Sequence, residues 1–549
     1  MTTTRNRRGA ALLLAACTLA TQAPFTASAE EPSRTAPAAL ASPRPTPTPL
    51  DLGPADLPET RSTRVLQPGV SLTQITRGRT DPSHVWTLEA LIPATSTSPD
   101  PDAPPQSLSD ADSAQALADR LRADGYPARV EEVTHPRTAD VPAGTLGYRV
   151  RVGSYPSKAE ADAARAELAA AGHAASSVFT GWDGEADDLG PWHVNVVRVD
   201  PRRLQGSLEA SYGPDLYGRE TTSALARAAG ATVGVNGGFF VLDPNAGAPG
   251  DPAGTGVYDG QLLSEPVGDR PALVLRPDGR GTAVERLTWA SRAEIDDRRL
   301  PLDGVNRVPG LVRNCGGEPS DAPTALPLHD VTCTDASELV AFTPAYGPTT
   351  PAGPGVEVVL GPDRVVRAVA QSRGTTLAAG QTSLQATGET AERLGTVEVG
   401  DHLDVRDRLV DGAGETLPTP GGTMVVNGGP QLVRDGRVEI TQRRDGMVHP
   451  GEPSFAYGWF LKRNPRTFAG VDDRGRTVLV TVDGRSTDDL GLSIPEAADV
   501  ARSLGLVDAL NLDGGGSTTL AVDGQLASHP SDTTGERPVG DALLVLPGR

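Results

Sequence analysis

A strand-like run that ends in an aspartate and three glycines is the feature that most restricts the fold of this sequence. Residues Val507 to Leu512 have the apolar composition of a buried strand, and Asp513 follows directly, ahead of Gly514, Gly515 and Gly516. Consecutive glycines suit positive φ angles or the close approach of backbone N–H groups to an anion. We expect a tight turn that presents the carboxylate to a ligand. A plain connecting turn is the alternative.

Length and charge limit the class of protein. The chain has 549 residues and a formal net charge of -20. Because this length exceeds the usual size of one hydrophobic core, two or more domains are expected. The acidic balance argues against nucleic acid or an anionic membrane surface as a general partner. Beyond the N-terminus no stretch approaches the roughly 20 apolar residues of a spanning helix, so we expect no transmembrane segment.

The N-terminus has the pattern of an export signal. Three arginines within the first eight residues precede an apolar run at residues 10–16, and the small residues Ala27-Ser28-Ala29 follow. This pattern predicts a signal peptide over residues 1–29 and a secreted protein, extracellular or associated with the cell wall. The run Leu14 to Cys17 resembles a lipobox, so lipoprotein anchoring through Cys17 is the less favoured alternative.

Two cysteines remain after the signal. Cys315 and Cys333 form an even pair in a chain bound for an oxidising compartment, which predicts a disulfide. His329 lies between them. One histidine and two cysteines without C-x-x-C spacing fall short of a zinc signature, so we expect no metal at this position.

Residues 30–80 are rich in Pro, Thr and Ala, and we predict a disordered linker there. Residues 81–182 then show a β-α-β-β-α-β order. The helices are expected at about 111–123 and 158–171, and the strands at 85–91, 128–133, 148–152 and 175–180. Such a module has one sheet face covered by helices and one open face.

The second half of this module resembles a SPOR domain. The resemblance rests on Tyr148 to Tyr155, read Y-R-V-R-V-G-S-Y, followed by Lys158-Ala159-Glu160-Ala161. It implies a ferredoxin-like fold whose open sheet face binds peptidoglycan glycan strands. The expected sugar contacts are Tyr148, Arg149, Arg151 and Tyr155, although strand alternation places only some of them on that face. A small α/β domain that merely supports the rest of the chain is the alternative.

Residues 190–549 are predicted to form one large domain in which strands dominate, with helices near 221–229 and 494–504. Two strand-like runs there end in the same turn, Asn236-Gly237-Gly238 and Asn427-Gly428-Gly429. Glycine turns at several strand ends can converge on one pocket, where backbone N–H groups and asparagine amides bind sugar hydroxyls or phosphate oxygens. Arg466 and Arg485 flank further strand ends and suit bidentate contact with a phosphate.

These segments together, in this order, resemble the phosphodiester glycosidase family. The resemblance covers about residue 192 to the end, and its motifs include V-N-G-G-F-F (235–240), V-N-G-G-P (426–430), N-P-R-T (464–467), V-D-G-R (482–485), N-L-D-G-G-G-S (511–517) and E-R-P-V (536–539). Departures occur at Phe468-Ala469, at Gly540-Asp541 and in the cysteine-bearing insertion. The expected fold is α+β: a ferredoxin-like SPOR module followed by a large mixed-sheet α/β phosphodiester glycosidase domain.

In a glycosyl phosphodiester the phosphate is a good leaving group, so arginines and backbone amides suit the phosphate and carboxylates suit the oxocarbenium-like sugar. The candidate catalytic residues are Asp513, Asp483 and Glu536. Asp483 orienting an arginine, and Glu536 in a structural role, are alternatives. The candidate substrate-binding residues are Asn236, Gly237, Gly238, Asn427, Gly428, Gly429, Arg466, Arg485, Gly514, Gly515, Gly516, Ser517 and Arg537.

The sequence therefore predicts a cell-wall-associated hydrolase of glycosyl phosphodiesters that a SPOR-like module holds on peptidoglycan. The alternatives are a glycan-binding protein without catalysis and a phosphodiesterase that cleaves the P–O bond. His449 is interpreted as a polar loop residue, with a proton shuttle as the alternative. No multi-ligand metal motif is visible, so no cofactor is expected to be required, although acidic glycine turns can bind a divalent cation.

Overall fold

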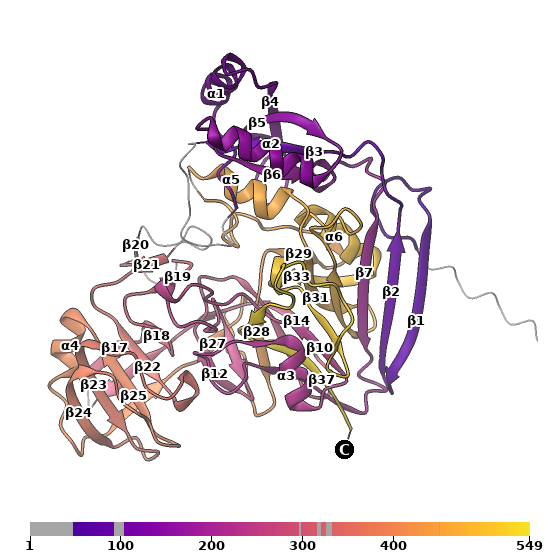
Figure 1. Ribbon diagram of the computed structural model, residues 1–549. Coiled ribbons are helices and arrows are strands. Elements are labelled where there is room, and N and C mark those ends of the chain that lie inside the picture. Colours follow the sequence, from indigo (N-terminus) through magenta and orange to yellow (C-terminus); the bar gives the residue numbers. More distant parts are fainter. Residues whose placement is uncertain are drawn as a thin grey trace, which may run out of the picture. The chain divides into compact units, whose positions relative to one another are not determined.

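The computed structural model describes residues 48–92, 104–295, 298–315, 320–324, 332–449 and 451–548. The predicted signal peptide, Cys17 and His329 lie outside the described residues. The described chain is α+β, with strands predominating over six α-helices, which confirms the expected class. Figure 1 shows these elements, and they belong to one compact unit that starts at Thr48.

An eight-stranded sheet forms the centre of the large domain. Its strands, in spatial order, are β1 (Glu59–Gln67), β2 (Val70–Arg77), β7 (Trp192–Val199), β32 (Thr477–Val482), β31 (Arg466–Asp472), β33 (Leu506–Asn511), β29 (Gln431–Arg434) and β30 (Arg437–Val438). All neighbouring strands in it pair antiparallel. The sheet thus combines segments from both ends of the chain.

The predicted disordered linker is wrong beyond residue 47, because β1 and β2 lie within residues 30–80. Strand β2 buries Leu72 and Ile75 and pairs with β7 from Val70 to Arg77. Strand β1 occupies the sheet edge, where most of its side chains stay exposed. Its Thr, Ser and Arg residues suit an edge strand, but their composition resembles that of a linker.

The predicted β-α-β-β-α-β module is confirmed, and it is inserted between β2 and β7. Its elements are β3 (Trp86–Ala90), α1 (Ala111–Ala123), β4 (Ala128–His135), β5 (Gly144–Tyr155), α2 (Lys158–Ala170) and β6 (Ala175–Phe179). The sheet order is β4-β5-β3-β6, the ferredoxin-like arrangement. Asp110 and Ser157 cap the two helices by accepting backbone N–H groups three residues on. Leu117, Leu121 and Leu168 pack these helices on one sheet face.

The other face of the module's sheet is not open as expected. A helical segment of the large domain lies against it, formed by α5 (Pro453–Ala456) and the π-helical turn η4 (Tyr457–Leu461). Tyr457 packs with Leu108 and Val133 of the module, and its hydroxyl contacts Arg149. In Figure 1 α5 lies beside the module's sheet.

Two five-stranded sheets complete the centre of the large domain. The first has the order β35 (Gln525–Leu526), β34 (Leu520–Val522), β10 (Val233–Asn236), β37 (Ala542–Pro547) and β8 (Gly206–Ser211). The second has the order β12 (Gln261–Ser264), β11 (Gly256–Tyr258), β28 (Met424–Asn427), β13 (Pro271–Leu275) and β14 (Ala283–Arg286). Apolar residues of all three large-domain sheets form one core, including Leu72, Val235, Val426 and Leu510.

The two predicted helices of the large domain are confirmed as α3 (Thr222–Ala229) and α6 (Ile494–Ser503). A capping box explains where α6 begins. The Ser493 side chain accepts the N–H of Glu496, and the Glu496 carboxylate accepts the N–H of Ser493.

A smaller group of strands, between residues 288 and 410, forms a core of its own. Its main sheet has the order β18 (Gly304–Val305), β22 (Leu339–Phe342), β25 (Thr382–Ala386), β23 (Gly353–Leu360) and β24 (Val366–Arg373), with α4 (Gly388–Leu394) beside it. Nearby, β19 (Val312–Arg313) pairs with β21 (Thr332–Thr334). The predicted disulfide joins Cys315 to Cys333 here, with a Cα–Cα distance of 5.3 Å.

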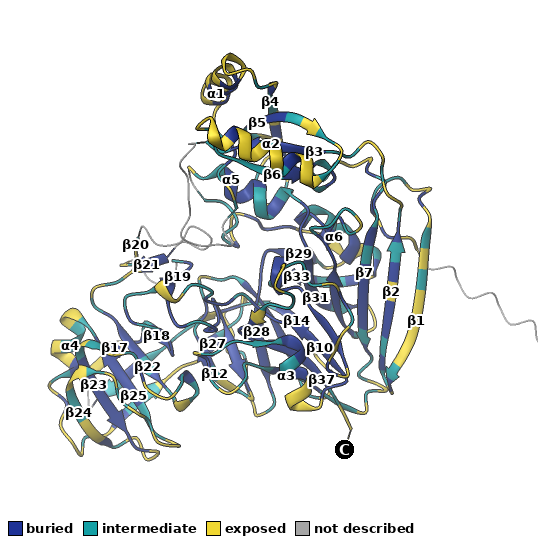
Figure 2. Cartoon of the chain, in the orientation of Figure 1, coloured by how far each residue is buried: buried dark blue, intermediate teal, exposed yellow. Residues whose placement is uncertain are grey.

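Burial follows the layers of the fold. Figure 2 shows central strands buried, whereas α1, α2 and the edge strand β1 expose much of their surface. Within the described ranges we find no helix with both the length and the apolar character needed to cross a membrane.

Candidate active site

Three strands from three different sheets end at asparagines that lie close together. Strand β10 ends at Asn236, β28 at Asn427 and β33 at Asn511. The turns that follow are joined by backbone hydrogen bonds, from Asp513 N to Gly237 O (3.1 Å) and from Gly429 N to Asn511 O (2.7 Å). The predicted convergence of the glycine turns is therefore seen in the structure.

The three asparagine amides hold these turns to one another. Asn236 donates from Nδ2 to the carbonyl of Asp513 (2.7 Å), and its Oδ1 accepts from Thr467 Oγ1 (2.7 Å). Asn427 bonds both the N–H and the carbonyl of Phe239, at 3.0 and 3.1 Å. Asn511 donates to the carbonyl of Gly429 (3.0 Å). These buried amides thus position the turns, and direct contact of Asn236 or Asn427 with substrate stays a prediction.

Asp513 lies half-buried at the junction of the turns, and its Oδ1 accepts the N–H of Gly514 at 2.9 Å. Gly515 has a φ of 58°, and a Cβ there would lie 3.0 Å from Nη2 of Arg485. This position therefore favours glycine both by conformation and by contact. The Ser517 hydroxyl is buried and has no hydrogen-bond partner among the described residues. The turn thus combines a carboxylate, a nearby guanidinium and a buried hydroxyl.

The two predicted phosphate-binding arginines differ. Arg485 has a φ of 59°, which is unusual for a residue other than glycine and marks a constrained position. Its Nε donates to Asn464 Oδ1 (3.3 Å), and its guanidinium carbon lies 5.9 Å from the centre of the Trp459 ring. Its guanidinium therefore lies between the glycine turn and an aromatic ring.

Arg466 is buried and bonds backbone carbonyls. Its Nε donates to Leu492 O (2.8 Å) and its Nη2 to Trp459 O (2.6 Å). Burial, together with the neighbouring Arg485, lowers the pKa of Arg466 to about 9. These bonds fix the Arg466 guanidinium on backbone carbonyls, with Arg485 as its charged neighbour. Direct contact of Arg466 with phosphate stays a prediction.

The C-terminal candidates are held by local partners. Both carboxylate oxygens of Glu536 bond Ser223 in the first turn of α3, at 2.7 Å to its N–H and 2.6 Å to its hydroxyl. Arg537 forms a two-pronged contact with Asp532, at 2.7 and 3.1 Å. A Cβ on Gly516 would lie within 2.3 Å of both Arg537 Nη2 and Asp532 Oδ1, so this pair borders the glycine turn. Glu536 anchors α3, which matches the structural alternative for this residue, and its catalytic role stays a prediction.

Asp483 belongs to a group of carboxylates and histidines. Its Oδ2 lies 3.1 Å from Nδ1 of His529, and His193 Nδ1 lies 2.5 Å from Asp489 Oδ1. Burial raises the pKa of Asp483 to about 6, with Asp489 adding to the effect. Ligand atoms of Asp483, Asp489 and His529 all lie within 4.8 Å of one another, so this group could hold a metal ion. Asp81, His84 and Asp188 form a second such group.

Asp541 is a site residue that the sequence reasoning missed. Its Oδ1 accepts the N–H of Gly238 (2.9 Å), and its Oδ2 accepts the Tyr258 hydroxyl (2.8 Å). Asp541 is buried, and its two bonds fix the 236–238 turn relative to Tyr258. The departure at Gly540-Asp541 was a visible signal, but nothing in the sequence placed this carboxylate against Gly238.

Replacing Asp541 with asparagine is expected to stabilise the fold at neutral pH. Burial raises the pKa of Asp541 from 3.8 to about 6. Between these values the folded chain keeps a proton that the unfolded chain has lost, so the free energy of unfolding falls as the pH rises through the window. The fall is about 1.4 kcal/mol for each pH unit between the two pKa values, or roughly 3 kcal/mol in all.

Urea unfolding of the wild type and of D541N, at about pH 4 and about pH 7, measures this effect. Asparagine can keep the contact with Gly238 and does not ionise. The variant should gain stability relative to the wild type as the pH rises. If the difference in free energy of unfolding between D541N and the wild type is the same at both pH values, ionisation of Asp541 does not lower the stability of the fold.

The expected peptidoglycan contacts are only partly available. Arg149 and Arg151 are buried and paired: Arg149 Nε contacts Glu131 (2.8 Å), and Arg151 contacts both carboxylate oxygens of Asp183, at 2.6 and 2.7 Å. The prediction that these two arginines contact sugar on an open face is therefore wrong for this structure. Tyr148 and Tyr155 are half-buried and pack on the module's core.

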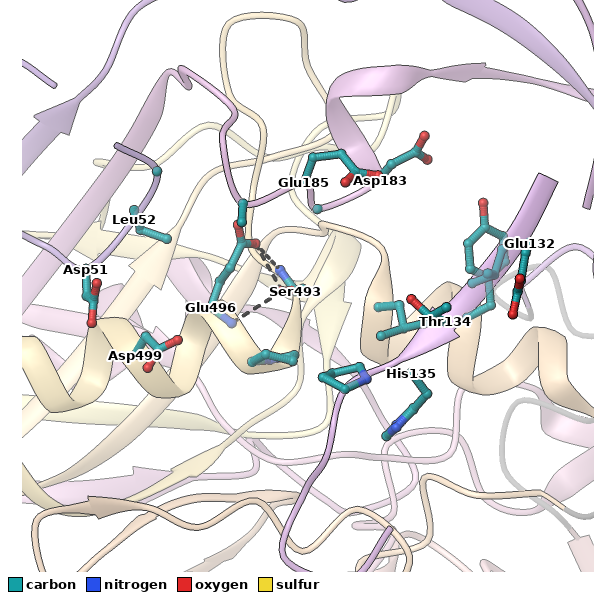
Figure 3. A pocket seen from close by; sticks show the side chains of 18 of the residues that line it. Asp51, Leu52, Glu132, Thr134, His135, Asp183, Glu185, Ser493, Glu496 and Asp499 are labelled. Carbon is teal, nitrogen blue, oxygen red and sulfur yellow. Dashed lines mark hydrogen bonds between the residues drawn. The ribbon is translucent and has the colours of Figure 1, made fainter. Parts of the chain in front are cut away.

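A cavity of about 530 Å³ lies where the module meets the large domain. Figure 3 shows Asp51 and Asp499 on one side of it, Glu132 and Thr134 on the other, and Glu496 between them, bonded to Ser493. Burial and the neighbouring Asp183 raise the pKa of Glu185 in its wall. A cavity with this many carboxylates disfavours a phosphodiester, so we place the candidate site at the glycine turns instead.

Comparison with known proteins agrees with this geometry. Residues 355–546 match the family model described as "Phosphodiester glycosidase", and residues 106–180 match the SPOR domain model. The chain therefore contains a phosphodiester glycosidase domain and a SPOR domain. The first match includes Arg466, Arg485 and Asp513, whereas the 236–238 turn lies outside it.

A close structural relative defines the family. The crystal structure of a "Putative exported protein" from Burkholderia pseudomallei shares 33% sequence identity and a TM-score of 0.80, covering 91% of this chain and 98% of that one. The chain belongs to the same family as that protein. A hypothetical protein from Synechocystis, with 19% identity, a TM-score of 0.51 and coverage of 89% and 76%, shares the fold.

Curated relatives match over a shorter region. The N-acetylglucosamine-1-phosphodiester alpha-N-acetylglucosaminidase of Bos taurus is 35% identical over 102 residues, which is 18% of this chain and 19% of the relative. The chain thus spans about a fifth of the length of the curated relatives it matches.

Proposed function

We propose that the chain is a hydrolase that cleaves glycosyl phosphodiesters at the bond between the anomeric carbon and the phosphate oxygen. The observation that carries this proposal is the position of Asp513. Three glycine turns meet at Asp513, whose carboxylate accepts the N–H of Gly514 (2.9 Å), and a Cβ on the next residue, Gly515, would lie 3.0 Å from Nη2 of Arg485. The site therefore offers negative charge for a sugar cation and positive charge for a phosphate.

The reaction asks for charge stabilisation on both sides of one bond. As the C1–O bond breaks, its electron pair stays on the phosphate oxygen, and C1 gains positive character. Arg485 and the backbone N–H groups of the turn suit the phosphate, and Asp513 suits the sugar. Water supplies the hydroxyl at C1, and a carboxylate that acts as base takes the proton of this water and then releases it to solvent. Asp513 serves either as the nucleophile or as the base for this water.

A direct test uses a phosphodiester of N-acetylglucosamine, the group in the names of the curated relatives. UDP-N-acetylglucosamine, or a purified teichoic acid, is incubated with the full chain, and free sugar is measured. We expect release of free sugar. Binding without release would favour the alternative of a non-catalytic glycan-binding protein, and release of a sugar phosphate would favour a phosphodiesterase.

We further propose that the reaction needs no metal ion. Imidazole groups already contact the two carboxylates of the Asp483 group, through the Asp483–His529 and Asp489–His193 pairs. Sugar release in the presence of EDTA should stay within about twofold of the untreated rate. The reason is that Arg485, and not a metal ion, stabilises the negative charge of the phosphate. Loss of activity that zinc or another divalent cation restores would instead assign a metal to Asp483, Asp489 and His529.

An extracytoplasmic, wall-associated location is part of the proposal. The SPOR domain, the disulfide and the likeness to the Burkholderia protein support it. Peptidoglycan is the proposed partner, but through a surface other than the covered sheet face. Full-length protein mixed with sacculi is expected to co-sediment. If the protein stays in the supernatant, peptidoglycan is not its partner.

A further inference from the structure

The covered face of the SPOR sheet carries a buried network of charges that ends on the large domain. Tyr457 of η4 is the link: its hydroxyl accepts from Arg149 Nη1 (2.7 Å) and donates to Glu89 Oε2 (2.8 Å). Lys462 follows η4 and lies 3.1 Å from Glu89 Oε1. The face therefore makes polar contacts with the first residue of η4 and with the residue that follows it.

A second set of contacts holds the same segment. The Ser454 hydroxyl in α5 accepts the N–H groups of Ser107 and Leu108, at 3.1 and 3.0 Å. A Cβ on Gly458 would lie 2.3 Å from Cβ of Pro104, so the backbone of η4 fits against residues that lead into the SPOR domain only as glycine. Residues 453–462 are thus fixed from the SPOR side along their length.

The same turn holds the candidate active site from its other side. The carbonyl of Gly458 accepts from Asn464 Nδ2 (3.0 Å), and Asn464 Oδ1 accepts from Arg485 Nε (3.3 Å). The Trp459 carbonyl accepts from Arg466 (2.6 Å), and the Trp459 ring lies against the Arg485 guanidinium. Single-turn π-helices occur frequently at functional sites. The turn η4 therefore contacts the SPOR sheet through Tyr457, Asn464 through Gly458, and both arginines through Trp459.

We propose that the SPOR sheet face positions the active site: through Tyr457 it holds η4, and η4 sets the place of Arg485. This rests on the proposed function and adds a role for the domain within it. Tyr457, Arg149 and Glu89 are positioning residues, because they act on the site through η4 and Lys462, which bond Arg466 and Asn464. Geometry shifts of about 1 Å can reduce rates by about a hundredfold, so a small movement of η4 would be felt at Arg485.

The cavity beside this contact indicates that η4 stays on the SPOR sheet face and is not displaced from it by a glycan strand. Arg149, Tyr457 and Leu461 line it, together with the carboxylates in Figure 3. Burial and the neighbouring Asp51 raise the pKa of Asp499, another carboxylate in its wall. A glycan strand that carries carboxylates would meet like charges here, which disfavours its entry between the sheet and η4.

The test is a double-mutant cycle between Tyr457 and Arg485. Tyr457→Phe removes the bridging hydroxyl and keeps the ring, and Tyr126→Phe, at a half-buried tyrosine on the helix side of the same domain, is the matched control. Steady-state hydrolysis of UDP-N-acetylglucosamine is measured for the wild type, Y457F, R485K and Y457F/R485K, with thermal unfolding alongside. We expect kcat of Y457F to fall about tenfold or more with a folded chain, and Y126F to match the wild type.

The double variant should lose little beyond R485K alone, because both changes act on the same guanidinium. Losses that multiply, or a Y457F variant with normal kcat, would overturn the inference. If Y457F does not fold, Gly458→Ala, which presses on Pro104, takes its place in the cycle with the same expectation. A wild-type chain without hydrolysis would refute the proposed function and this inference with it, whereas an active wild type with additive losses overturns the inference alone.

Discussion

Asparagine in place of Asp513 should reduce sugar release from a glycosyl phosphodiester by about a thousandfold or more, with the fold unchanged. The substitution keeps the shape of the side chain and an oxygen that can accept the N–H of Gly514. The backbone bonds from Asp513 to Gly237 and Asn236 do not involve the side chain, so the turns stay in place. Only the negative charge beside the sugar is lost.

Asp508→Asn is the matched control for this experiment. Asp508 lies on the same strand, β33, and is half-buried, but it pairs with Arg434 instead of facing the turn. Circular dichroism and thermal unfolding establish that both variants fold, and kcat is then compared with the wild type. The control should retain full turnover. A D513N variant with wild-type turnover would remove Asp513 from the reaction.

Glutamine in place of Glu89 is expected to destabilise the chain by about 3–5 kcal/mol, because it leaves buried cations without their partner. Burial alone would raise the pKa of Glu89, but Lys462, Arg151 and Arg149 hold it well below its usual value. Its carboxylate contacts Arg151 (3.2 Å), Lys462 (3.1 Å) and the Tyr457 hydroxyl (2.8 Å). Removing this one charge affects both domains at once.

Denaturant unfolding followed by tryptophan fluorescence measures the loss. The control is Asp162→Asn, which breaks the exposed helical pair of Asp162 with Lys158 and should change the free energy of unfolding by only about 0.5 kcal/mol. Equal and small effects of E89Q and D162N would show that the buried network contributes no more than a surface ion pair.

Local patterns predicted much of this fold. The module's helices were foreseen because their sequences are amphipathic and each ends at a glycine ahead of a strand, and Asp110 and Ser157 cap them in the structure. The disulfide followed from cysteine number and compartment. Strand β1 was missed because an edge strand needs few apolar side chains, and its Thr-, Ser- and Arg-rich sequence resembles a linker.

The sequence predicted which chain segments form the candidate site, but not which contacts their side chains make. Glycine turns after apolar strands indicate where a ligand can bind, and the turns that follow Asn236, Asn427 and Asn511 do meet. Which partner each of these side chains binds depends on long-range contacts. The amides of Asn236 and Asn427 bond backbone groups in other turns, and Glu536 bonds Ser223 in a distant helix. The covered sheet face, with Arg149 on Tyr457, joins residues about three hundred positions apart, which no local pattern encodes.

The most direct test of the central claim is hydrolysis of UDP-N-acetylglucosamine by the full chain in water enriched in oxygen-18. Cleavage of the C1–O bond leaves every oxygen of the phosphate in place, so the account predicts free N-acetylglucosamine together with UDP that carries no label. Label in the phosphate product, or release of a sugar phosphate, would mean that the P–O bond is cleaved and would contradict the account.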